Sequence, residues 1–353
     1  MNDQNLLPKI RRPIVIIGAG SIVNDAHLPA YGLASFDVAG IFDINKERAQ
    51  MIAEKFRIPR VYESLDQLVQ QAPENAVFDM ALPASAIIES LQNLPNGSPV
   101  LIQKPMGNNF KEAKEILEIV RNKKLLAAMN FQLRYAPFIL SARDIINKGL
   151  IGDLSDIEIN VNIYHPFHLW DFLFKSERVE ILYHSIHYID LVRTFLGNPL
   201  GIYAKTTKHS MMPALASVRS SIIMDYGDWI RANIFTNHCH DFHPKYQHAF
   251  IKFEGSKGAF RVNMGLLMDY PKGTADTVEF ITREGSPEPQ WQTLAVEGSW
   301  FPESFVGTMS QVMKAASGEI EKPDNSVEDC IYTMACVEAA YESSEKGGTK
   351  LPR

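Results

Sequence analysis

The turn Gly18-Ala19-Gly20, which directly follows the apolar run 14–17, constrains this sequence more than any other feature. A buried strand, a glycine turn and the start of a helix together form a pyrophosphate site, because the backbone N–H groups of the turn can approach the anion. A second apolar run, 38–42, ends on Asp43, near the spacing at which an acidic side chain meets the ribose hydroxyls of NAD. Val23 replaces the third glycine of the usual pattern. We predict a dinucleotide site here, and the alternative is an ordinary strand, turn and helix without a nucleotide.

The charges near this turn favour NAD over NADP. Asp43 would repel a 2′-phosphate, whereas Lys46 and Arg48 lie near enough in the chain to soften that preference. The predicted cofactor contacts are Gly18, Gly20, Ser21, Ile22, Asp43, Arg48, Pro83 and Lys104.

Composition excludes several other classes of protein. The chain of 353 residues is long enough for two domains, and its net charge of −6, without a basic block, gives no surface for nucleic acid. No apolar stretch is long enough to span a bilayer, and the first twelve residues lack a signal-peptide core, so we expect no membrane partner and a cytoplasmic protein. Three cysteines without a C-x-x-C pair indicate neither disulfides nor a zinc–cysteine site.

The first part of the chain alternates short apolar runs with helical patterns. Such βαβ units predict a doubly wound parallel sheet with helices on both faces. The expected strands are 14–17, 38–42, 77–82, 100–102 and 125–129, and the expected helices are 45–56, 64–71, 84–93 and 111–123. Ser64 and Gln67 have the spacing of a capping box. We place this first domain at 1–133.

The second part, 134–353, has a different pattern. After a helix at about 137–148, residues 156–163 alternate strictly between apolar and polar, which is typical of a sheet with one buried face. This predicts an α+β domain with mainly antiparallel strands. Further expected strands are 200–207, 216–225, 229–237, 248–254, 258–263 and 277–282, and helices near 303–317 and 326–345 close the chain.

Two groups of residues carry the predicted chemistry. Lys104 directly follows the strand 100–102, at the carboxyl edge where ligands of parallel sheets bind, although a surface lysine in a turn is an equal alternative. Tyr183, His184 and His187 are spaced to share one face of a helix, and imidazoles suit proton transfer near neutral pH. A hydrogen-bonded structural histidine is the commoner role for any one of them.

Histidines concentrate in one region of the chain. Nine of the ten lie between His165 and His248, and the loop 165–171 adds aromatic side chains such as Trp170. Aromatic faces and polar edges suit a carbohydrate, whereas a self-packed loop is the alternative. His184 with His187, or His238 with His240 and His243, could ligate a metal, but no H-E-x-x-H or cysteine pattern accompanies them, so we predict none.

Together these motifs resemble the Gfo/Idh/MocA family of NAD(P)-dependent sugar and polyol oxidoreductases. The resemblance covers nearly the whole chain and rests on the sequences Gly18-Ala19-Gly20, His27-Leu28-Pro29-Ala30, Asp43, Lys104-Pro105, Gln132-Leu133-Arg134-Tyr135, Pro137, His187, Ile189-Asp190 and Gly197. It implies a Rossmann domain followed by a large open-sheet domain, with Lys104, His187 and Tyr183 as catalytic residues. It also implies hydride transfer from a sugar, polyol or sugar acid, with Arg134, His165, Trp170 and His184 at the substrate.

Two departures from the family pattern affect the chemistry. Gln103 stands where the family usually has Glu, and Tyr183 stands where many members have Asp. We expect neutral His187 to act as the base and Lys104 to stabilise the alkoxide. The alternatives are an NAD-dependent glycosidase on the same scaffold and a non-catalytic NAD-binding sensor. The resemblance further implies a homodimer or homotetramer, whose interface through the strand 156–163 would be polar and wet.

Overall fold

The computed structural model describes residues 6–352 except 271 and 286. It divides into two compact units. The first consists of the chain up to Ala136 together with Trp300–Met334, and the second consists of Pro137–Ser299 and the chain from Ala335 onward. The division expected at 133/134 placed residues 300–334 in the second domain, whereas here they return to the first.

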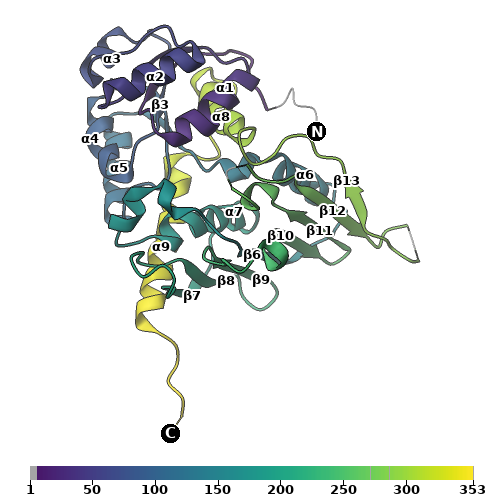
Figure 1. Ribbon diagram of the computed structural model, residues 1–353. Coiled ribbons are helices and arrows are strands. Elements are labelled where there is room, and N and C mark those ends of the chain that lie inside the picture. Colours follow the sequence, from purple (N-terminus) through teal and green to yellow (C-terminus); the bar gives the residue numbers. More distant parts are fainter. Residues whose placement is uncertain (1–5, 271, 286, 353) are drawn as a thin grey trace. The chain divides into compact units, whose positions relative to one another are not determined.

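The first unit contains a parallel sheet with the strand order β2-β1-β3-β4-β5, covered by helices on both faces (Figure 1). Its described strands are β1 (Ile14–Ile17), β2 (Val38–Phe42), β3 (Val77–Met80), β4 (Pro99–Ile102) and β5 (Leu126–Met129). Its helices are α1 (Leu28–Leu33), α2 (Lys46–Phe56), α3 (Leu65–Gln71), α4 (Ala84–Asn93), α5 (Phe110–Asn122) and α8 (Ser304–Ala316). The predicted doubly wound sheet is confirmed.

The chain order of these strands fixes where a ligand can bind. From β1 the chain goes to β2 on one side and then crosses to β3 on the other. Ligands of open α/β sheets bind beyond the carboxyl ends of the strands at such a reversal. The turns after β1 and β3 therefore border the expected cofactor crevice.

Helix α8 explains the return of residues 300–334. It packs on β4, β5 and α1, and its Phe305, Met309 and Val312 belong to the same apolar core as Ile14 and Ile16 of β1. The burial of this face ties the segment to the first unit. The long helix α9 (Val327–Lys346) begins in the first unit and continues into the second.

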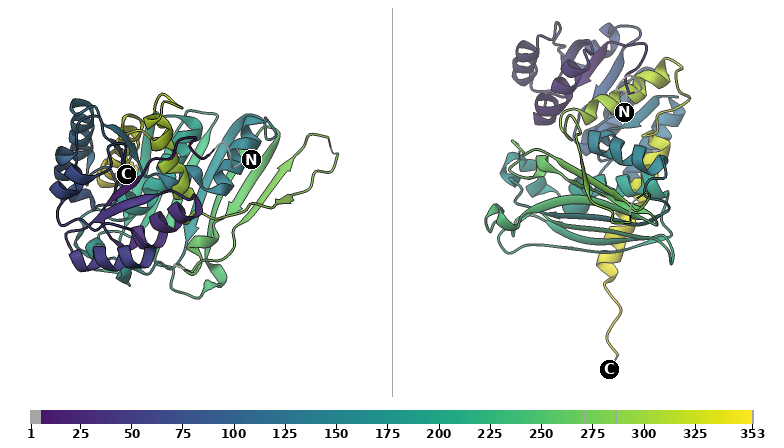
Figure 2. Two further views of the ribbon diagram at one scale, coloured as in Figure 1. Left: turned by 90° about the horizontal axis from the view of Figure 1, so that it is seen from above. Right: turned by 90° about the vertical axis from the view of Figure 1, so that its right-hand side faces the viewer.

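The second unit contains a sheet with the order β13-β12-β11-β10-β6-β9-β8-β7, antiparallel except between β6 and β9 (Figure 2). Its described strands are β6 (Leu154–Asn162), β7 (Gly201–Thr207), β8 (Arg219–Asp225), β9 (Arg231–Asn237), β10 (His248–Gly255), β11 (Gly258–Asn263), β12 (Thr277–Thr282) and β13 (Gln292–Leu294). The mainly antiparallel open sheet is thus confirmed, and the short strand β13 was not predicted.

Alternation along the strands explains why one face of this sheet is covered. Ile157, Ile159 and Val161 of β6 are fully buried, and helices α6 (Pro137–Asn147) and α7 (Ile186–Leu196) lie over that face (Figure 1). The ring centroids of Phe195 on α7 and Phe253 on β10 lie 4.7 Å apart. Among the described residues, no helix combines the length and apolar character needed to cross a membrane.

Local signals in the sequence account for several helix starts. The Ser64 hydroxyl accepts a hydrogen bond from the backbone N–H of Gln67 at 3.0 Å, and the Gln67 side chain accepts one from the N–H of Glu63 at 2.6 Å. This confirms Ser64 as the helix cap, whereas the reciprocal bond of Gln67 goes to the residue before the cap and not to Ser64 itself. Two turns of π-helix, Val23–His27 and Glu180–Ser185, were not predicted, although helical patterns were expected nearby.

Candidate functional site

The glycine turn after β1 has the geometry of a phosphate-binding turn. Gly18 has a φ of 108°, which side chains rarely adopt, and a Cβ there would lie 2.5 Å from the carbonyl oxygen of Ala81. A Cβ on Gly20, in contrast, would meet no described atom within 4 Å. The first glycine thus allows the tight turn, and the second leaves the backbone open to a ligand.

Asp43 is held at the end of β2 by two backbone N–H groups. Ala19 donates to Oδ2 and Asn45 donates to Oδ1, each at 2.7 Å. A carboxylate has about four acceptor positions, so Asp43 retains capacity for hydroxyl donors. Nearby, Lys46 forms an ion pair with Glu63, with nitrogen to oxygen distances of 2.6 and 2.7 Å, whereas Arg48 is exposed.

The other predicted cofactor contacts lie on the same unit. Ser21 is exposed directly after the glycine turn, and Ile22 packs partly against the apolar core. Pro83 is exposed at the start of α4, in the turn after β3. Whether these residues touch a cofactor stays a prediction.

Lys104 lies at the end of β4, beside the end of β3. The backbone N–H of the preceding Gln103 donates to the carbonyl of Met80 at 2.9 Å, which fixes this turn against β3. Burial lowers the pKa of Lys104 from its ordinary 10.5 to about 8, because the charged ammonium is poorly solvated. A pKa shifted by burial at the ligand edge of a parallel sheet makes Lys104 a candidate functional residue.

A buried polar network supports the Gln103 side chain. The Asn130 amide donates to Gln103 Oε1 at 2.8 Å and lies 3.2 Å from His27 Nε2, while its oxygen accepts from Thr308 at 2.9 Å. If His27 Nε2 accepts from the Asn130 amide, its Nδ1 carries the proton that faces Asp79. These contacts link the Gln103 side chain to the buried side chains of His27 and Asp79.

The network ends on the carboxylate of Asp79. Its Oδ2 lies 2.8 Å from His27 Nδ1 and accepts from the hydroxyl of Tyr31 at 2.7 Å, and all three side chains are buried. Burial, and then the charge and hydrogen bond of Asp79, raise the pKa of Tyr31 well above its ordinary value. Tyr31 therefore remains a hydrogen-bond donor across the physiological pH range.

The second unit carries the predicted catalytic histidine. His187 lies in the first turn of α7 and is 7% exposed, and the π-helical turn before it carries Tyr183 and His184. Tyr183 packs its ring 5.3 Å from that of Phe172. Single π-helical turns occur often at functional sites, because the extra residue redirects the side chains around it.

Aromatic packing organises the predicted substrate loop. The rings of His165 and Trp170 stack in parallel at 4.8 Å, and His165 meets His184 edge-on at 4.9 Å. Phe167 packs at 5.6 Å from His184 in the same group. The structure thus brings three of the predicted substrate residues, His165, Trp170 and His184, into one cluster.

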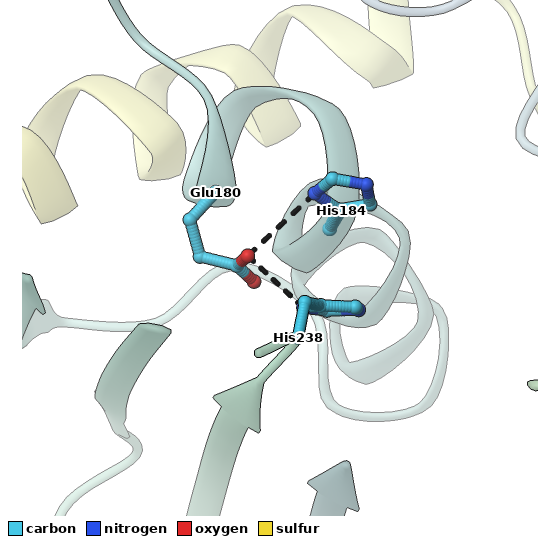
Figure 3. Close-up of side chains that lie close together, drawn as sticks. All are labelled: Glu180, His184 and His238. Carbon is cyan, nitrogen blue, oxygen red and sulfur yellow. Dashed lines mark hydrogen bonds and ion pairs between the residues drawn. The ribbon is translucent and has the colours of Figure 1, made fainter. Parts of the chain in front are cut away.

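Glu180 adds a buried carboxylate to this cluster (Figure 3). Its Oε2 lies 3.0 Å from His238 Nδ1 and 3.6 Å from His184 Nδ1. Burial alone would raise the pKa of Glu180, but the charges and hydrogen bonds of His238 and His184 outweigh it and hold this pKa well below its ordinary value. The sequence reasoning grouped His184 with His187, and His238 with His240 and His243, and did not consider Glu180.

Arg134, a predicted substrate contact, makes strong contacts within the first unit. Its guanidinium donates to the carbonyl of Asp324 at 2.6 Å and to the carboxylate of Asp329 at 2.7 Å, and the residue is 3% exposed. These bonds give the side chain a structural role, and its contact with a substrate stays a prediction.

The fold, the glycine turn and the acidic residue after β2 define a dinucleotide-binding α/β protein. A model described as an oxidoreductase family with an NAD-binding Rossmann fold matches residues 12–131, and one described as the C-terminal alpha/beta domain of an oxidoreductase family matches 143–352. The chain therefore belongs to the Gfo/Idh/MocA family of oxidoreductases.

Individual relatives are distant. An uncharacterized protein of Saccharomyces cerevisiae is 31% identical over 138 residues, which cover 38% of this chain and 39% of that protein. The glucose-6-phosphate 3-dehydrogenase of Bacillus subtilis is 28% identical over 151 residues, 42% of each chain. These matches span about two fifths of the relatives' length. An Agrobacterium radiobacter oxidoreductase, solved with NAD+, L-tartaric acid and magnesium, has a TM-score of 0.79 at 20% identity, covering 96% of this chain and 98% of the other.

Proposed function

We propose that this protein is an NAD-dependent dehydrogenase that oxidises or forms a hydroxyl group of a sugar, polyol or sugar acid. The observation that carries the proposal is Lys104, whose pKa is lowered to about 8 at the carboxyl edge of the sheet that also carries the Gly18 turn. A cation held there can stabilise the charge that develops on a reacting oxygen. Membership of an oxidoreductase family supports the same reaction class.

The residues at the turn fit a dinucleotide. The backbone around Gly20 is open where a pyrophosphate would approach, and Asp43 is fixed with acceptor positions to spare for the ribose hydroxyls. Bound NAD would supply the acceptor for a hydride from the carbinol carbon. His187 would take the hydroxyl proton as a neutral base, and Lys104 would stabilise the alkoxide.

The preference for NAD is tested at Asp43. An Asp43→Ala variant should raise the ratio of NADP to NAD affinity by roughly tenfold or more, because a carboxylate that repels a 2′-phosphate is removed. Glu54→Ala, which removes an exposed acidic side chain near the end of α2, is the control and should leave this ratio unchanged. Equal ratios in the two variants would contradict the role of Asp43.

The reaction class is tested by NADH formation at 340 nm with a panel of aldoses, inositols, polyols and sugar acids. One substrate should give turnover, and Lys104→Ala and His187→Ala should each lower the rate about a hundredfold or more. Lys111→Ala, at an exposed lysine of α5, should not. Product without accumulated NADH would indicate the glycosidase, and tight NAD binding without turnover on any substrate would indicate the sensor.

We also propose a homodimer or homotetramer formed through the uncovered face of the eight-stranded sheet. The support is a group of exposed apolar side chains on neighbouring strands, Tyr203, Ile223 and Phe235. This face is therefore less polar than the sequence of β6 indicated. Phe235→Glu should lower the mass measured by light scattering, and Met51→Glu, at an exposed methionine of α2, should not.

A further inference from the structure

The cluster of Glu180, His184 and His238 has the composition of a metal site. The three side chains come from two parts of the second unit, since Glu180 and His184 lie on the π-helical turn and His238 follows β9. Figure 3 shows the carboxylate of Glu180 directed toward both imidazole rings. Their candidate ligand atoms all lie within 4.8 Å of one another.

Two of the three separations between the ligand atoms are close to those around a small tetrahedral ion, and all three lie within 4.8 Å. Zinc binds imidazole nitrogen and carboxylate oxygen at about 2.0–2.2 Å, so two ligand atoms of one tetrahedron lie about 3.4 Å apart. The carboxylate oxygen Oε2 lies 3.0 Å from one imidazole Nδ1 and 3.6 Å from the other. Movements of a few tenths of an ångström would bring both pairs to that separation.

A hydrogen bond from a neighbouring hydroxyl group fixes the position of the Glu180 carboxylate. The Ser185 hydroxyl donates to Glu180 Oε1 at 3.1 Å, and it lies 2.9 Å from the Ser220 hydroxyl. Oxygen Oε1 is thereby engaged, and Oε2 is the atom that faces the imidazoles. Such hydrogen bonds to a ligating carboxylate orient it and strengthen metal binding.

The charge of Glu180 is compatible with a cation here. Glu180 is 0% exposed, and a buried carboxylate needs positive charge or hydrogen-bond donors beside it, which an ion bound between it and the imidazoles would supply. Two imidazoles and one carboxylate form the donor set of several catalytic zinc sites, whereas magnesium and calcium prefer oxygen ligands.

We propose that Glu180, His184 and His238 bind one divalent transition-metal ion such as Zn²⁺. Three protein ligands leave a fourth position for water or for a hydroxyl or carboxylate oxygen of a small molecule. The inference does not depend on the proposed dehydrogenase activity, because it concerns binding of the metal alone.

The test is a Zn²⁺ titration of the chelator-treated full-length protein against a chromophoric competitor. The wild-type protein should bind one equivalent, and His184→Gln and His238→Gln should each weaken this binding by at least about a hundredfold. The matched control is His248→Gln. His248 Nε2 lies 3.0 Å from Asn160 Oδ1, and β-strand alternation places it on the opposite sheet face from Thr236 and His238.

A second measurement covers the case in which these variants fold poorly. The wild-type protein titrated with Co²⁺ should develop the intense visible absorption of a four-coordinate site, and Zn²⁺ should abolish it in a 1:1 ratio. No equivalent of bound Zn²⁺, equal affinities in all three histidine variants, or a weak six-coordinate Co²⁺ spectrum would overturn the proposal.

Discussion

Replacing Lys104 by Met should stabilise the folded protein while removing the charge that the proposed reaction needs. Burial lowers the pKa of Lys104 from 10.5 to about 8, so the folded state disfavours the ammonium. At about 1.4 kcal/mol for each pKa unit, the charged side chain costs about 3 kcal/mol at pH 7. Methionine has a similar length and no charge. The free energy of unfolding of Lys104→Met should therefore exceed that of the wild type by most of this amount.

The sign of the pH dependence makes this prediction sharper. Well below pH 8, Lys104 is protonated in both the folded and the unfolded protein. The free-energy cost of burying its charge is then complete. Between about pH 8 and 10.5 the unfolded chain binds more protons, so the stability of the wild-type protein rises relative to Lys104→Met. The difference between the two proteins should fall from about 3 kcal/mol at pH 7 to about 1.5 kcal/mol at pH 9.5.

Urea unfolding curves of both proteins at the two pH values measure this difference. Comparing the variant with the wild type cancels the titration of all other groups. Lys111→Met, at an exposed lysine on α5, is the control and should change the free energy of unfolding little at either pH. A Lys104→Met protein that is less stable than wild type at pH 7, or a difference that does not vary with pH, would refute the reasoning.

Three further outcomes are expected. Gly18→Ala should lower the free energy of unfolding by about 2–4 kcal/mol in urea unfolding, because of its left-handed φ and the nearby carbonyl oxygen, whereas Gly20→Ala should change it by less than about 1 kcal/mol. Tyr31→Phe should cost about 2 kcal/mol in the wild-type protein and less than half of that in an Asp79→Ala background, as measured by a double-mutant cycle. Gln103→Glu should raise the pKa of Lys104, so the stability gained by Lys104→Met in that background should shrink at pH 7.

Much of the fold could be predicted because its signals are local. The apolar runs 14–17 and 38–42, the helix cap at Ser64 and the strict alternation near 156–163 each depend on neighbours in the chain. The return of α8 to the first unit is different. Its apolar face fits any core, and only the packing of Phe305 and Met309 beside β1 decides which core it joins.

The candidate site residues also differ in whether local sequence signals predict them. Gly18, Asp43 and Lys104 follow strands directly, so the sequence places them at one sheet edge. The buried network is not local, because Tyr31, Asp79 and Asn130 lie on three separate segments. The Glu180 cluster was missed for a related reason. A π-helical turn has no simple sequence pattern, and His238 reaches Glu180 only through sheet pairing that brings β9 beside β6 and β8. The enrichment of histidines between His165 and His248 was the one signal that pointed there.

The presence of Gln103, where the family usually has Glu, affects the pKa of Lys104. A Glu at this position would place a negative charge next to Lys104 in the chain and favour its ammonium form. Gln103 instead presents a neutral amide, and its oxygen is engaged by Asn130. The carboxylate of that network, Asp79, is bound by His27 and Tyr31 at its far end. Burial therefore decides the pKa of Lys104, which falls to about 8. A lysine in that range holds its charge at neutral pH yet releases its proton at little cost. In the proposed reaction, Lys104 can therefore donate a proton to a forming hydroxyl as well as stabilise an alkoxide.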